Sequence, residues 1–132
     1  MRNNRAIDQT TPGESNAVSL KKGTASTVHA AITGTALSAE IDCTGYNAVL
    51  VEVAISVAVK NWTFSIQGCL VSGGTFVDVY ELANTGSMAA MSYQCNASRM
   101  FIFKGAPNYI KVNASEDEDG ATVTVKVQPI NA

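Results

Sequence analysis

The stretch that decides the fold is residues 48–59, which read AVLVEVAISVAV. β-branched side chains recur there at every second position, namely Val49, Val51, Val53, Ile55, Val57 and Val59. The positions between them carry smaller or more polar side chains. A helix would mix the two sets, and β-branched residues lose side-chain freedom in a helix. The stretch therefore predicts a long strand with one buried face.

The same alternation continues on both sides of this stretch, interrupted by glycine- and asparagine-containing turns. We expect strands over residues 26–33, 37–41, 48–59, 62–69, 76–82, 89–95, 99–104, 109–114 and 121–130. Trp62 alternates in phase with Phe64 and Ile66, which predicts a core position for its ring. One helical turn is expected near residues 88–91, and Pro129 predicts that the chain leaves the sheet there. Many short strands without a long amphipathic helix predict an all-β antiparallel β-sandwich, of the jelly-roll type.

Composition sets the class of protein. The chain has 132 residues, of which 46% are hydrophobic and 15% charged, so it can build one real core and is not a disordered chain. The longest apolar stretch is broken by Glu52 and is too short to span a bilayer, which argues against a membrane protein. The net charge is −2 and the basic residues are scattered, which argues against nucleic-acid binding.

The first 24 residues differ from the rest of the chain. They are polar and include Pro12, Gly13 and Gly23, which predicts an extended N-terminal arm before a β-sandwich domain over residues 25–132. A polar arm can order on contact with a partner and cover much of its surface. We interpret seven side chains of the arm as candidate partner-binding anchors: Arg2, Arg5, Ile7, Val18, Leu20, Lys21 and Lys22.

The cysteines indicate a reducing compartment. There are three of them, and no pair has the spacing of a zinc or redox motif. The start of the chain is polar and has no signal peptide, so we expect free thiols in a cytoplasm. Cys69 and Cys95 lie in predicted strands and are expected to pack as small hydrophobic residues.

No set of residues in the sequence points to catalysis. The single histidine, His29, lies in a predicted strand and is interpreted as structural. There is no nucleophile elbow and no phosphate-binding loop, and nothing brings Glu52 and Asp78 together as a carboxylate pair. We therefore predict no enzyme activity, no catalytic residue and no cofactor.

The acidic turn at residues 116–119 has oxygen donors followed by Gly120, as in calcium loops. It lacks the twelve-residue loop and the closing glutamate, so a solvated hairpin tip is favoured and no metal site is assigned. A sugar-binding platform would need exposed aromatic rings. Four tyrosines could supply them, namely Tyr46, Tyr80, Tyr93 and Tyr109.

Four motifs carry a resemblance to a known family. They are IDCTGYNAVLVEV at residues 41–53, WTFSIQG at 62–68, GGTFVDV at 73–79 and YIKV at 109–112. The sequence resembles small virion proteins of tailed bacteriophages and prophages that are encoded beside the major capsid protein.

This resemblance implies a head decoration (cement) protein, on the exterior of a capsid and made in the cytoplasm of a host bacterium. Its expected partner is the major capsid protein. A homo-oligomer is also expected, a trimer before a dimer. The alternative is a β-sandwich binding module, for carbohydrate or protein, in a phage fibre, neck or tail component.

Overall fold

The computed structural model describes residues 22–82 and 88–131, and every regular element in them is a strand. The strands are β1 (Ser26–Ile32), β2 (Ala36–Leu37), β3 (Ile41–Asp42), β4 (Ala48–Ile55), β5 (Trp62–Cys69), β6 (Val77–Asp78), β7 (Tyr80–Leu82), β8 (Met88–Ala90), β9 (Ser92–Cys95), β10 (Arg99–Lys104), β11 (Tyr109–Glu116) and β12 (Val123–Ile130). This part of the chain contains no helix that could cross a membrane. The prediction of an all-β protein is confirmed.

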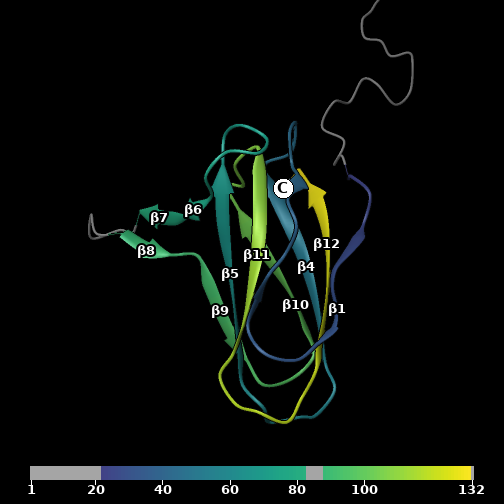
Figure 1. Cartoon of the computed structure of the whole chain (residues 1–132). Helices are drawn as coiled ribbons and strands as arrows, with labels where there is room; N and C mark the ends of the chain where they lie inside the picture. Colours follow the sequence, from purple (N-terminus) through teal and green to yellow (C-terminus); the bar gives the residue numbers. More distant parts are fainter. Residues whose placement is uncertain (1–21, 83–87, 132) are drawn as a thin grey trace, which may run out of the picture.

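Ten of the twelve strands form two antiparallel sheets packed face to face, and β7 and β8 pair with each other as a separate two-stranded sheet (Figure 1). The first sheet has the order β1-β12-β4-β10. In the second, β11 and β5 lie at the centre, with β2 and β3 against β11 and with β6 and β9 against β5. The first strand thus lies beside the last, and β3, β4 and β5 alternate between the sheets, as do β9 to β12. This is the order of a jelly roll, and the predicted sandwich is confirmed.

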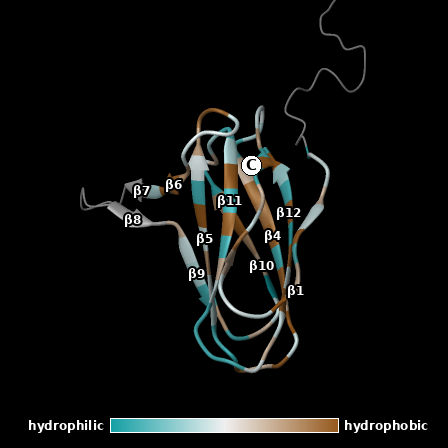
Figure 2. Ribbon diagram, in the orientation of Figure 1, coloured by the Kyte–Doolittle hydropathy of each residue, from teal (hydrophilic) through white to brown (hydrophobic). Residues whose placement is uncertain are grey.

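The core lies between the sheets and follows the period-two pattern. Val49, Val51 and Val53 of β4 are at most 1% exposed, and Trp62 and Phe64 of β5 are fully buried against them. Each such side chain contributes about 1.5–3 kcal/mol when it is fully buried. Figure 2 shows hydrophobic segments that alternate with paler and hydrophilic ones along the central strands.

The long strand is shorter than predicted. β4 ends at Ile55, and Val57 and Val59 lie in the following turn with exposed side chains. The backbone amide of Ser56 donates to the carbonyl of Thr122, and the amide of Thr122 donates to the Ser56 hydroxyl. These bonds are the last ones between this end of β4 and the residues before β12. Val57 and Val59 come after them, so the valine pattern extends past the paired part of the chain.

Some other boundaries also differ from the prediction. The segment 37–41 is divided into β2 and β3 because Ser38 turns to Val112: its amide donates to the Val112 carbonyl, and its hydroxyl accepts from the Val112 amide. The predicted strand 76–82 is divided at Val79, and the predicted strand 89–95 is divided at Met91. The amide of Met91 donates to the carbonyl of Val79, so the two interruptions lie side by side.

Two local predictions, for residues 88–91 and for Pro129, were wrong. Residues 88–90 form strand β8 in place of a helical turn, because they pair with β7. Pro129 stays inside β12, opposite Val49 of β4. On its other side the amide of Gly23 donates to the Pro129 carbonyl, and this contact needs no N–H from proline.

Candidate functional site

Of the seven candidate anchors in the arm, one lies among the described residues. Arg2, Arg5, Ile7, Val18, Leu20 and Lys21 lie outside them, so their role stays a prediction. Lys22 is exposed, and its backbone forms an isolated antiparallel bridge with Ile130 at the end of β12. Lys22 and Gly23, where the described residues begin, therefore lie against the end of β12, and we call this contact the junction.

Hydrogen bonds hold this junction. The amide of Gly23 donates to the Pro129 carbonyl at 2.7 Å, and Gln128 Nε2 donates to the Gly23 carbonyl at 2.9 Å. A Cβ at position 23 would lie 3.3 Å from the Tyr46 ring and 3.3 Å from the Pro129 carbonyl oxygen. The chain passes so close to β12 at this point that a residue without a side chain fits best.

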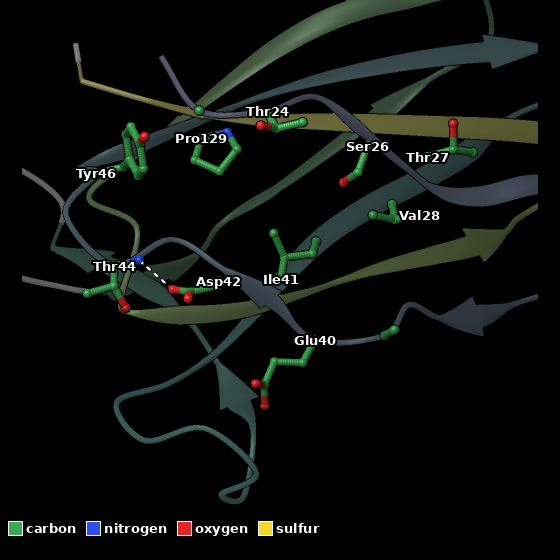
Figure 3. A pocket seen from close by; sticks show the side chains of 12 residues that line it. Thr24, Ser26, Thr27, Val28, Glu40, Ile41, Asp42, Thr44, Tyr46 and Pro129 are labelled. Atoms are coloured by element: carbon green, nitrogen blue, oxygen red, sulfur yellow. Dashed lines mark hydrogen bonds between the residues drawn. The ribbon is translucent and has the colours of Figure 1, made fainter. Parts of the chain in front are cut away.

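An open groove of about 560 Å³ begins at this junction (Figure 3). It runs between β1, at the edge of one sheet, and β3, at the edge of the other. Its lining comes from three distant parts of the chain: Gly23, Thr24, Ser26, Thr27 and Val28; Ala39, Glu40, Ile41, Asp42, Thr44 and Tyr46; and Pro129. The groove combines small apolar side chains with hydroxyl groups and two carboxylates.

Both carboxylates of the groove are held by hydrogen bonds from their own chain. The amide of Thr44 donates to Asp42 at 2.9 Å and lowers the pKa of that carboxyl group. The Ser72 hydroxyl and the Gly73 amide donate to Glu40 at 2.6 and 2.8 Å, and they lower the pKa of Glu40. Among the described residues the groove lining contains these two carboxylates and no basic side chain, and Lys111, outside the lining, also lowers the pKa of Glu40. This arrangement suits a positively charged segment better than an anionic ligand.

His29 lies in the core and ties the two sheets together. Its side chain is 5% exposed, and Nε2 donates to the Val112 carbonyl at 3.0 Å, from β1 in one sheet to β11 in the other. The carbonyl can only accept, so Nε2 carries the hydrogen. The interpretation of His29 as a structural residue agrees with this position.

The two possible partners of a carboxylate pair lie in different sheets. Glu52 is exposed on β4, whereas Asp78 lies on β6 opposite Gln67. The structure does not bring them together.

The acidic turn is shorter than predicted, because Glu116 is half-buried at the end of β11, and its exposed residues 117–119 are tied to the rest of the sandwich. Asp117 Oδ2 accepts from the Thr63 hydroxyl at 2.6 Å and from Gln94 Nε2 at 3.1 Å. Glu118 Oε1 accepts from the amide and the side chain of Asn61, at 2.8 and 3.1 Å. Among residues 22–82 and 88–131, no three His, Cys, Asp or Glu side chains gather as metal ligands would. The two carboxylates therefore connect this turn to β5, to β9 and to Asn61.

The aromatic residues lie in several places, since Tyr46 lines the groove and Tyr80 is 51% exposed on β7. Trp62 is fully buried, as predicted, and stacks on Phe64 with 6.4 Å between ring centroids. Tyr93 is 44% exposed but stacks flat on Phe101, with 4.9 Å between centroids, and closes the gap between β9 and β10. The ring of Tyr93 is therefore partly used in packing and does not lie open as a sugar platform would.

The three cysteines are free. Cys43 is fully buried, and burial raises the pKa of its thiol to about 11. Cys95 is buried as predicted, and burial raises its pKa too. Cys69 is only half-buried, and its thiol donates to the Val71 carbonyl. The prediction that Cys69 packs as a hydrophobic residue is thus only partly met.

No known protein family and no curated protein matches the sequence. Among solved structures, the fold is similar to the crystal structure of SPBc2 prophage-derived protein YomS, with a TM-score of 0.59 and 16% sequence identity. The match covers 85% of this chain and 95% of that chain. It therefore extends over nearly the whole of the other protein, and at this identity it shows a shared fold.

Proposed function

We propose that the protein is a structural component of a tailed-phage or prophage virion, and specifically a head decoration protein that binds the major capsid protein on the capsid exterior. The observation that carries this proposal is the fold match to a prophage-derived protein over 95% of its length. The motifs at residues 41–53, 62–68, 73–79 and 109–112 support it, since they resemble small virion proteins encoded beside the capsid gene.

The sandwich suits this role mechanically. Its two sheets enclose one continuous core and are tied by the bond from His29 to Val112. A protein that binds the assembled lattice more tightly than its separate subunits stabilises the lattice by mass action. Such a protein needs a rigid body and a contact surface.

The arm is the contact we assign to the capsid. Before Lys22 it carries Arg2, Arg5 and Lys21 against Asp8 and Glu14. It enters the sandwich at a fixed point, because Gly23 is bonded to β12. An arm anchored at one end can reach a neighbouring subunit, although ordering it costs part of the binding free energy.

The test is co-sedimentation with purified heads that lack the protein. The full chain should sediment with the heads. A variant without residues 2–20 should stay in the supernatant while its far-ultraviolet circular dichroism remains that of the full chain. Arg2→Ala/Arg5→Ala is the milder variant, to be compared with Asp8→Ala in the same arm. Undiminished binding of the truncated chain would refute the role of the arm. Binding to tails but not to heads would favour the fibre, neck or tail component.

A further inference from the structure

The free edges of the sandwich differ in how well they could accept another strand. β1 is irregular, with register shifts on both sides of His29 and a positive φ of 47° at Ala31. β2, β3 and β6 have two residues each, and β9 has four. Bulges and very short strands are devices by which natural sheets prevent pairing with other chains. All of these edges are therefore protected.

Strand β10 has no bulge, it is longer than β2, β3, β6 and β9, and its two charged residues, Arg99 and Lys104, lie only at its ends. Its six residues, Arg99–Lys104, pair with β4 without a register shift. Within residues 22–82 and 88–131, no strand pairs with its other side. Every second residue of β10 thus directs its backbone N–H and C=O groups away from the sheet. A regular, unpaired edge of this length is a template for another strand.

The outer face beside this edge is also apolar. Met100 is 60% exposed and Ile102 is 44% exposed, and Ile102 lies opposite Leu50 of β4. The outer face of the other sheet instead carries polar side chains, namely Thr63, Ser65, Gln67, Lys111, Asn113 and Ser115. An apolar strip made of Leu50, Met100 and Ile102 therefore reaches the open edge of one sheet only.

We propose that two copies of this chain pair through β10, antiparallel and edge to edge, about a two-fold axis at Ile102. In this register Ile102 lies opposite the second copy's Ile102, and Met100 lies opposite the second copy's Lys104. Residues of the same parity face each other, so the apolar strips join on the outer face of one continuous sheet.

The charges favour a second copy over an unrelated strand. Glu52 is exposed on β4, between Met100 of β10 on one side and Lys126 of β12 on the other in the register. The second copy's Lys104, which lies across from Met100, can extend its long stem along that side chain toward the Glu52 carboxylate. The same contact occurs twice about the axis. In the proposed register Arg99 lies opposite the second copy's Gly105, so no two like charges lie directly opposite each other.

The protected edges also set the number of copies. A ring of three joined by strands needs two different edges on each copy, whereas a two-fold pair uses one edge twice. Since β10 is the one long and regular free edge among the described strands, the structure favours the dimer, which the sequence ranked second to a trimer. This pairing is independent of the role proposed in the virion, because it involves purified protein alone.

The first test is the mass of the full chain in solution, by sedimentation equilibrium over a range of concentrations. We expect about 28 kDa at high concentration, twice the 13.8 kDa of one chain. Ile102→Lys should raise the dissociation constant at least about tenfold, because two ammonium groups would then meet at the axis. Met100→Lys, at a more exposed position, serves if the first variant does not fold. Val77→Lys is the matched control, as Val77 is 61% exposed on the short strand β6.

Two further measurements identify the edge and the partner. The outward amides of β10 should exchange with deuterium more slowly as the protein concentration rises. Glu52→Lys and Lys104→Glu should each weaken pairing by about threefold, and the double variant should restore it. A monomer at all concentrations, a trimer, a dimer unaffected by either lysine substitution, or β10 amides that exchange equally fast in monomer and dimer would each overturn the proposal.

Discussion

Gly68→Ala tests the packing of the second sheet, because position 68 has no room for a methyl group. Gly68 is buried in β5, and a Cβ there would lie 2.9 Å from Val79 Cγ2 and closer still to the ring of Pro107. Both neighbours are stiff: proline is a ring, and valine is restricted at χ1. The methyl group can be accommodated only if the turn at residues 105–107 moves away from β5.

The magnitude follows from two opposing effects. Overpacking of this kind costs about 1–3 kcal/mol. Replacing glycine by alanine also restricts the unfolded chain, which offsets about 0.4–1 kcal/mol. We therefore expect a net loss of about 1–2 kcal/mol. With an unfolding entropy of about 2.1 cal/mol/K per residue, this lowers Tm by about 4–7 °C for 132 residues.

The assay is thermal and urea denaturation of Gly68→Ala, Pro107→Ala and the double variant. Pro107→Ala removes the ring atoms nearest to the added methyl group, so the double variant should be more stable than the sum of the single effects predicts. We expect a coupling free energy of about 1 kcal/mol. If Gly68→Ala is as stable as the parent chain, the close approach of the 105–107 turn to β5 is wrong.

Three other predictions test the ties described above. His29→Phe removes the donor to the Val112 carbonyl across the sheets and should lower the free energy of unfolding by about 1 kcal/mol, measured by urea denaturation with His29→Gln as the variant that keeps a donor. The pKa of Cys43 is raised from 9.0 to about 11, so the folded state favours the neutral thiol. The contribution of the neutral Cys43 thiol to the free energy of unfolding is complete below pH 9 and is lost as the pH rises toward 11. The urea midpoint of the parent chain should therefore fall over this range, and it should fall less in Cys43→Ala. Glu40→Ala removes the acceptor of the Gly73 amide, so this amide should exchange faster by NMR, whereas an unchanged rate would contradict the bond.

The alternation of side chains predicted most of the central strands, because burial on one face leaves a signal at every second residue. It failed where pairing ended for another reason. Val57 and Val59 continue the pattern of β4, but Ser56 and Thr122 have already closed the strand. Pro129 was expected to end pairing, yet it stays in β12: its carbonyl accepts from the Gly23 amide, and Gln128 Nε2 supplies the donor to the Gly23 carbonyl.

The candidate surfaces were much harder to predict. The groove is assembled from residues near 23, 40 and 129, and no local pattern relates segments so distant in sequence. The alternation of Met100 and Ile102 with Phe101 and Phe103 is visible in the sequence, but it does not reveal that β10 lies at an edge. Whether a strand lies at an edge depends on the topology of the sheet. A long apolar strand therefore has the same sequence pattern at the edge of a sheet as in its centre.

The place of β12 has a consequence for the order of folding. β12 lies between β1 and β4, and Ile130 bridges back to Lys22, so among the described strands β1 has β12 as its one partner in the first sheet. A nascent chain that does not yet include β12 therefore leaves β1 and one edge of β4 unpaired. The first sheet can close only after residues 123–130 have been synthesised, and a chain truncated before them would leave β1 without a strand to pair with.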